Sequence, residues 1–172
     1  MRLTGESSHQ PGSARLRQAA PGEDMIDPNA EAYTQKARQN LAAADTARAA
    51  GQYDVAASRA YYAAFLAAVA ALWIEGIRPL TERQGTLSHE AVQGEWSGRL
   101  VYRRKLYTPE HRATLYSLYK WRIKADYHAE RVTAREARQA CQQGRQLVQA
   151  VLGRLRVDDR LEESHGTEGF GH

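Results

Sequence analysis

The sequence predicts an all-α protein, an up-and-down bundle of four long helices and one short helix. Alanine supplies much of the 42% hydrophobic content and proline occurs only 5 times in 172 residues, a composition typical of helical proteins. Apolar residues recur every three or four positions through several segments, which is the period of a helix facing a core. No segment reads as a pair of strands. A chain of this length is expected to form one domain.

The two ends of the chain differ in composition from its middle. Residues 1–24 combine glycine, serine, proline and scattered charges without periodicity, so we expect a disordered extension there. A helical domain is predicted over residues 25–157. Residues 158–172 are acidic and contain glycine, and we expect them to form a flexible tail.

The first helix is predicted over residues 28–50. Asp27 is a suitable N-cap, and Pro28 occupies the first helical position, where its missing N–H has no cost. Gly51 is expected at the C′ position that ends the helix.

The second helix, predicted over residues 55–75 with Asp54 as its N-cap, has apolar residues on two sides. Such a helix belongs at the centre of a bundle. Its uncharged stretch, residues 60–74, is shorter than the roughly 20 residues that span a bilayer, so we expect no membrane association.

A short third helix is predicted to begin at Ser88-His89-Glu90 and to end near residues 94–98. The basic residues 103–105 are expected to lie in an irregular segment. The fourth helix, residues 108–128, begins with threonine as N-cap and proline in its first turn.

A fifth helix follows, and Thr133 and Glu136 form a capping box at its start. Its apolar stripe runs from Ala137 to Leu155 at helical spacing. We therefore expect it to pack along the bundle.

Charge is distributed unevenly along the chain. Residues 99–138 hold 11 Lys and Arg against 4 Asp and Glu, an excess that attracts polyanions such as RNA. A solvated helical surface is the alternative interpretation of such a run. If RNA binds, the candidate contacts are Arg103, Arg104, Lys105 and Lys124.

The segment most informative about function is residues 115–128. Arg122 lies on the same helical stripe as apolar residues, so its guanidinium needs an anion, which Asp126 one turn later can supply. His128 follows, and histidine is the side chain best suited to proton transfer near neutral pH. Arg122, Asp126 and His128 are therefore the candidate catalytic residues, although an Arg122–Asp126 pair could equally serve only to stabilise a helix interface.

RNA cleavage suits this small set of groups, because the substrate supplies its own nucleophile, the 2′-hydroxyl. No metal or cofactor is required. Residues six apart on a helix differ by about 120° in direction and about 9 Å in rise, so Arg122 and His128 of one chain do not converge easily. Two chains crossing at the fourth helix would bring both pairs to one cleft, which predicts a homodimer.

Other catalytic classes lack their sequence signals. The chain has no Walker-type glycine loop, no His-Glu-x-x-His pair and no Gly-x-Ser-x-Gly elbow. The single cysteine, Cys141, excludes an internal disulfide and a cysteine-based zinc cluster. No apolar segment follows Met1, so we expect a cytoplasmic protein.

Two segments, residues 51–65 and residues 118–127, resemble the signatures of HEPN-domain proteins, the second through an Arg-x-x-Ala-Asp-Tyr pattern. The resemblance covers roughly residues 28–156. It implies a helical bundle that usually dimerises. Many members are metal-independent ribonucleases with an arginine, four to six residues and then histidine, a pattern that Arg122 and His128 match.

The resemblance implies two alternative functions. Such ribonucleases often act as toxins paired with a small nucleotidyltransferase antitoxin. Active members commonly have a polar residue after the arginine, whereas Ile123 stands there in this chain. The alternative is a non-catalytic interaction module that binds a nucleotidyltransferase partner or a nucleotide.

Overall fold

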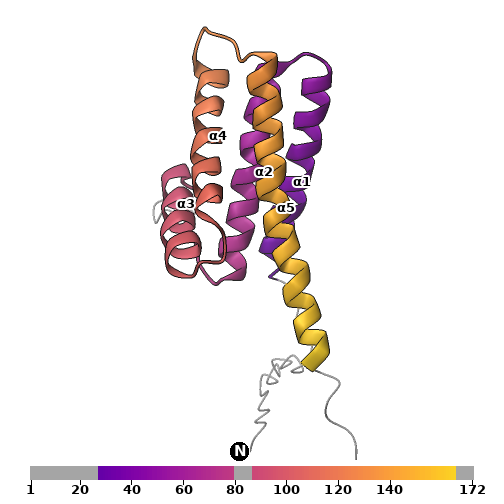
Figure 1. Ribbon diagram of the computed structural model, residues 1–172, viewed down its shortest axis with the longest axis vertical. Helices are drawn as coiled ribbons and strands as arrows, with labels where there is room; N and C mark the ends of the chain where they lie inside the picture. Colours follow the sequence, from indigo (N-terminus) through magenta and orange to yellow (C-terminus); the bar gives the residue numbers. More distant parts are fainter. Residues whose placement is uncertain (1–26, 80–86, 166–172) are drawn as a thin grey trace, which may run out of the picture.

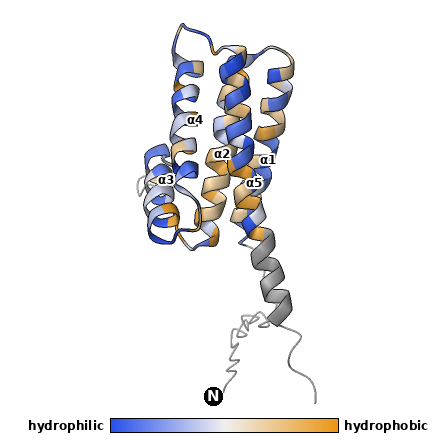
Figure 2. Ribbon diagram, in the orientation of Figure 1, coloured by the Kyte–Doolittle hydropathy of each residue, from blue (hydrophilic) through white to orange (hydrophobic). Residues whose placement is uncertain are grey.

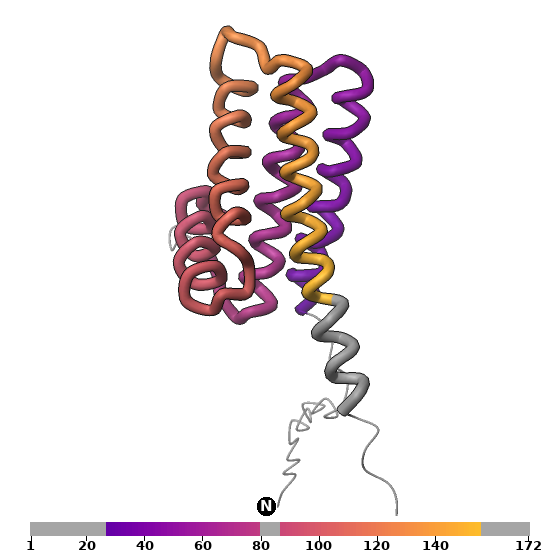
Figure 3. The backbone as a smooth tube through the Cα atoms, in the orientation of Figure 1, coloured from indigo at the N-terminus to yellow at the C-terminus, as the bar shows by residue number. Residues whose placement is uncertain are grey.

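The computed structural model describes residues 27–79 and 87–165, with side chains given through Leu155. Its long helices are α1 (Pro28–Ala49), α2 (Tyr53–Ile74), α4 (Pro109–Tyr127) and α5 (Ala134–His165), and they alternate in direction (Figures 1 and 3). Between α2 and α4 lie the short α3 (His89–Glu95) and the π-helix η1 (Trp96–Arg103). The predicted up-and-down helical bundle is confirmed. The predicted N-terminal extension, residues 1–24, lies outside the described residues.

The first helix begins and ends as its sequence signals predict. The Asp27 carboxylate accepts a hydrogen bond from the backbone N–H of Asn29 at 2.9 Å, and Pro28 follows in the first turn. Gly51 has a φ of +74° directly after the C-cap residue. Glycine adopts this left-handed conformation without steric cost, so the chain can turn into α2.

Asp54 does not cap α2, and that prediction is wrong. The helix begins one residue earlier, at Tyr53, with Gln52 in the N-cap position. The Asp54 carboxylate instead accepts a hydrogen bond of 2.7 Å from the backbone N–H of Val132, in the connection between α4 and α5. Aspartate often caps helices, but Asp54 instead joins the start of α2 to the α4–α5 connection. Local sequence rules cannot predict this role, because the two segments are distant in the chain.

The third helical segment begins as predicted and extends further than predicted. The Ser88 hydroxyl accepts a hydrogen bond from the N–H of Ala91, which caps α3. Helical backbone then continues through η1 to Arg103 instead of ending near residues 94–98. Buried Val92, Trp96 and Leu100 recur every four residues, so core packing carries the helix past its glycines.

The fifth helix also runs further than the sequence analysis predicts. Its capping box is present: Glu136 accepts from the Thr133 N–H at 2.7 Å, and the Thr133 hydroxyl lies 3.3 Å from the Glu136 N–H. The backbone remains helical to His165, past residue 158, where the predicted tail begins. Residues 158–165 contain neither glycine nor proline, so nothing in the local sequence ends the helix there.

The core is centred on α2, which packs against α1, α4 and α5. Figure 2 shows apolar residues along α2 and hydrophilic residues on much of the outer surface of α5. By length and composition α2 could span a membrane, but most of its apolar stretch is buried inside the bundle, as in the core helix of a soluble protein. Nine of the thirteen buried residues of α2 are alanines, at positions 56, 57, 60, 63, 64, 67, 68, 70 and 71.

Small residues permit the close approach of α2 and α5. A Cβ atom built on Gly144 would lie 2.9 Å from the backbone oxygen of Ala60. Because that neighbour is backbone, it cannot rotate away as a side chain would. The two helices therefore approach closely only with glycine at position 144.

We predict that Gly144→Ala destabilises the protein, because α2 and α5 must separate to admit the methyl group. Overpacking of this kind costs about 1–3 kcal/mol. The matched control is Gly153→Ala in the same helix, where an added Cβ meets nothing within 4 Å. That variant should gain up to about 1 kcal/mol from helix propensity. Urea unfolding of the two variants checks the prediction, and equal midpoints would contradict it.

Candidate functional site

Arg122 lies near the end of α4 with its side chain only 13% exposed. Its Nε atom is 2.8 Å from an Asp126 carboxylate oxygen, so the ion pair expected from the sequence is present. The Ser58 hydroxyl of α2 donates to the same carboxylate oxygen at 3.4 Å. The pair therefore also joins α4 to the central helix.

Two tyrosines complete the surroundings of the guanidinium. Arg122 Nη2 donates to the hydroxyl oxygens of Tyr62 and Tyr127, each at 3.2 Å. Burial alone would lower the pKa of Arg122, but the two tyrosines and Asp126 outweigh it and raise the pKa. Within the described residues Nη1 makes no hydrogen bond. One edge of a fixed, charged guanidinium is thus left for an anion.

His128 stands outside the helix that carries Arg122. It is the C-cap of α4, with an extended backbone (φ −95°, ψ 149°), and its backbone N–H donates to the carbonyl of Lys124. The side chain is exposed and contacts neither Arg122 nor Asp126. One protomer therefore brings Arg122 and Asp126 together, and leaves His128 apart from both.

Lys124, a candidate RNA contact, is already paired with acidic side chains. Its Nζ atom lies 2.9 Å from a Glu130 carboxylate oxygen and 3.0 Å from a Glu136 carboxylate oxygen. Both carboxylates raise the pKa of Lys124. The backbone N–H of Thr133 and then Lys124 lower the pKa of Glu136 to about 2. Two negative charges offset this lysine, so it adds little attraction for a phosphate.

The three basic residues between η1 and α4 differ in their partners. Arg104 forms an ion pair with Glu75 at the end of α2. Arg103 and Lys105 are exposed, and neither forms an ion pair with a described residue. Lys105 has a φ of +52°, at the point where the chain turns from η1 toward α4. Of these three candidates, Arg103 and Lys105 keep their positive charge free.

The structure adds His89 to the candidate site, a residue that the sequence analysis used only as the start of a helix. Its Nδ1 atom lies 2.7 Å from the hydroxyl oxygen of Tyr61. Its ring packs among aromatic rings at centroid distances of 4.7 Å to Phe65 and 6.1 Å to Tyr119. The ring of Tyr62, which holds Arg122, is 6.2 Å away.

Burial and a nearby positive charge both change the pKa of His89. Burial lowers the pKa of His89, and the positive charge of Arg122 lowers it further. Burial also raises the pKa of Tyr61. The two groups are therefore neutral partners in one hydrogen bond near neutral pH. No local sequence pattern predicts the contact between His89 and Tyr61, because it depends on how the chain after α2 returns α3 to the bundle.

Among residues 27–79 and 87–155, no group of three His, Cys, Asp or Glu side chains is placed to hold a metal ion. Cys141 is buried and lies 3.8 Å from the carbonyl oxygen of Ala44. Its pKa is raised, chiefly by burial. Cys141 is therefore a small buried thiol within the apolar stripe of α5.

Comparison with known families gives one match. A family model described as HEPN domain matches residues 30–155, which run from α1 into α5 and include Arg122, Asp126 and His128. A comparison with curated proteins gives no match.

We predict that acidification destabilises the wild-type protein more than it destabilises His89→Gln. A histidine whose folded-state pKa lies below the ordinary value of 6.5 takes up more protons when unfolded. Its stabilising contribution is therefore present above that pH and is lost as the pH falls below it. Glutamine can still accept a hydrogen bond from Tyr61 but does not titrate.

The measurement is the free energy of unfolding of both proteins between pH 8 and pH 5. The pKa of His111 is also lowered by burial, but its contribution is common to both proteins and cancels in the difference. Parallel pH profiles would show that His89 does not differ in protonation between the folded and unfolded states.

Proposed function

The chain belongs to the HEPN domain family, and from that premise we propose that it is a metal-independent endoribonuclease, the toxin half of a toxin–antitoxin pair. The observation that carries the proposal is the arrangement around Arg122. A charged guanidinium is fixed by Asp126 and two tyrosines with Nη1 left free, six residues before the exposed imidazole of His128. We place this activity in the cytoplasm.

The proposed reaction uses the 2′-hydroxyl of the RNA as nucleophile. Its oxygen bonds to the adjacent phosphorus while the bond to the leaving 5′-oxygen breaks, which yields a 2′,3′-cyclic phosphate. His128 is the proton-transfer group at the 2′-oxygen or at the leaving oxygen. Arg122 stabilises charge on the phosphoryl oxygens, and Asp126 orients Arg122 through the 2.8 Å pair.

A homodimer follows from the placement of the two candidate groups. One histidine cannot both accept and donate a proton at the same instant, whereas two copies supply two imidazoles. The end of α4 also exposes an aromatic ring, because Tyr127 is 67% exposed beside Arg122. We therefore propose that the C-terminal ends of two α4 helices meet and join the Arg122 and His128 groups of both chains.

A second function is favoured by the same pair. The guanidinium of Arg122 already has three partners, and Ile123 stands where active relatives carry a polar residue. These contacts suffice to explain Arg122 as an element of helix packing. In that case the chain is a non-catalytic interaction module, whose partner is a nucleotidyltransferase or a nucleotide.

We predict that the purified protein cleaves single-stranded RNA in excess EDTA and leaves 2′,3′-cyclic phosphate ends. His128→Ala should reduce the rate by about 10²–10⁴-fold, as expected for the loss of a proton-transfer group. Because His128 is exposed and its side chain forms no hydrogen bond or ion pair with a described residue, this variant should keep its thermal midpoint. Equal cleavage by both proteins would assign the activity to a contaminant and favour the interaction module.

Two substitutions, Arg122→Ala and Arg122→Lys, distinguish the contribution of the positive charge to cleavage from that of the planar guanidinium. Alanine leaves Asp126 without its partner, so a loss of activity would be accompanied by a loss of stability. Lysine keeps the charge but cannot reproduce the contacts of the planar guanidinium with Asp126 and the two tyrosines. Cleavage should therefore fall in both variants, and an Arg122→Lys protein of wild-type activity would remove the role given to the fixed guanidinium.

We predict a dimer at micromolar concentration, measured by light scattering. Tyr127→Glu should favour the monomer, because it places two carboxylates at the proposed contact of the α4 ends. Arg38→Glu on α1 is the control, an exposed position without an ion pair among the described residues. A wild-type protein that stays monomeric would exclude the site shared between two chains.

A further inference from the structure

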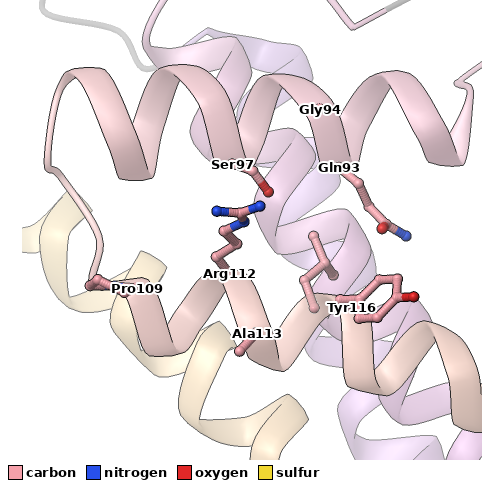
Figure 4. A pocket seen from close by; sticks show the side chains of 8 residues that line it. Gln93, Gly94, Ser97, Pro109, Arg112, Ala113 and Tyr116 are labelled. Atoms are coloured by element: carbon pink, nitrogen blue, oxygen red, sulfur yellow. The ribbon is translucent and has the colours of Figure 1, made fainter.

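A groove separates α3 and η1 from the first half of α4. It consists of two adjoining hollows of about 610 and 830 Å³, which share Ser97, Pro109 and Arg112 in their lining. In Figure 4 the side chain of Arg112 extends from α4 toward Ser97, and Gln93 and Tyr116 lie at the far end of the first hollow. The shared residues place the two hollows side by side along the same stretch of α4.

The groove has three cationic side chains in its lining, all in the second hollow, and one of them, Arg112, also lines the first. Arg103, Lys105 and Arg112 line it, and none of the three forms an ion pair with a described residue. No aspartate or glutamate belongs to the described lining of either hollow. Nearby Arg104 is paired with Glu75, so three of the four basic residues in and beside the groove carry a charge without an ion pair. Such a depression attracts a chain of negative charges.

Two exposed aromatic rings accompany these charges. Tyr102 lines the second hollow and is 78% exposed, and Tyr116 lines the first and is 54% exposed. The Lys120 ammonium lies 4.6 Å from the centroid of the Tyr116 ring, which adds another cation beside the ring. Rings this exposed contribute little to the core and offer flat surfaces to a ligand.

We propose that this groove binds single-stranded nucleic acid. Arg103, Lys105 and Arg112 contact its phosphates, and Tyr102 and Tyr116 stack on its bases. Cations that follow a backbone, interspersed with aromatic platforms, are the features by which proteins hold single strands. A duplex keeps its bases stacked inside and offers no face to the tyrosines.

The inference rests on the proposed function for the choice of RNA as the natural strand. Tyr116 precedes Arg122 by six residues, a distance of about 9 Å along the axis of α4. Residues six apart on a helix also differ by about 120° in direction, so a strand in the groove reaches the guanidinium proposed to hold the scissile phosphate by passing around α4. The groove would supply binding that Lys124 and Arg104, both held in ion pairs, do not.

The test measures binding of a fluorescent 2′-O-methyl oligouridine of about ten nucleotides, within the usual site size of single-strand binders. The probe lacks a free 2′-hydroxyl, so the proposed nuclease cannot cut it. The logarithm of the association constant is plotted against the logarithm of the salt concentration. With three phosphate contacts, the slope of this plot should be about −2. Arg112→Gln should make the slope shallower by about 0.7.

Two substitutions of Tyr102 test whether its ring stacks on a base. Tyr102→Ala should weaken binding about tenfold, and Tyr102→Phe, which keeps the stacking surface, should bind as the wild type does. Arg38→Gln is the control for net charge, since it removes the same charge as Arg112→Gln from an exposed position on α1. Its salt slope should not change. Equal effects of the Arg38 and Arg112 substitutions would overturn the proposed groove.

The outcomes for the groove and for the ribonuclease can be distinguished. His128→Ala should bind the probe with wild-type affinity while it loses cleavage. Groove-dependent binding by a protein that never cuts RNA would remove the ribonuclease and keep the groove. Cleavage that continues while the groove substitutions leave affinity unchanged would remove the groove and keep the ribonuclease. If these substitutions instead alter only the dimer equilibrium, the groove receives a second copy of the chain and the inference is overturned.

Discussion

The close packing of α2 against its neighbours is the constraint on which the rest of the structure depends. Most of its buried residues are alanines, and the backbone of Ala60 approaches Gly144 of α5 so closely that even a methyl group would not fit. A centre built from such small side chains leaves no space for charged groups. Polar residues of α2 and α4 are therefore placed at the margin of the core, where Tyr62 and Ser58 meet the Arg122–Asp126 pair.

The position of Arg122 at the edge of the core explains why a catalytic role and a packing role both fit its contacts. The contacts that fix it are the contacts that a structural ion pair would have, and they also align a guanidinium with a free Nη1 edge. Preorganisation and packing use the same hydrogen bonds, so one arrangement of side chains serves both roles. In the proposed homodimer, the position of the second His128 decides whether this guanidinium meets a proton-transfer group.

The basic character of the middle of the chain becomes more specific in three dimensions. Ion pairs with Glu75, Glu130 and Glu136 offset Arg104 and Lys124, whereas Arg103 and Lys105 stay free beside Arg112. A count of charges along the sequence cannot make this distinction, because the partner of Arg104 lies 29 residues away. The groove beside η1 therefore keeps three cations that no ion pair offsets.

The sequence by itself determined the helical class, the order of the long helices, the caps at Asp27, Ser88 and Thr133 and the Arg122–Asp126 pair. These features depend on residues within about one helical turn of one another, where spacing alone sets the contact. Only the tertiary structure decided the link from Asp54 to the α4–α5 connection, the burial of His89 and the groove. Each of these joins segments distant in the chain, and their meeting depends on how whole helices pack.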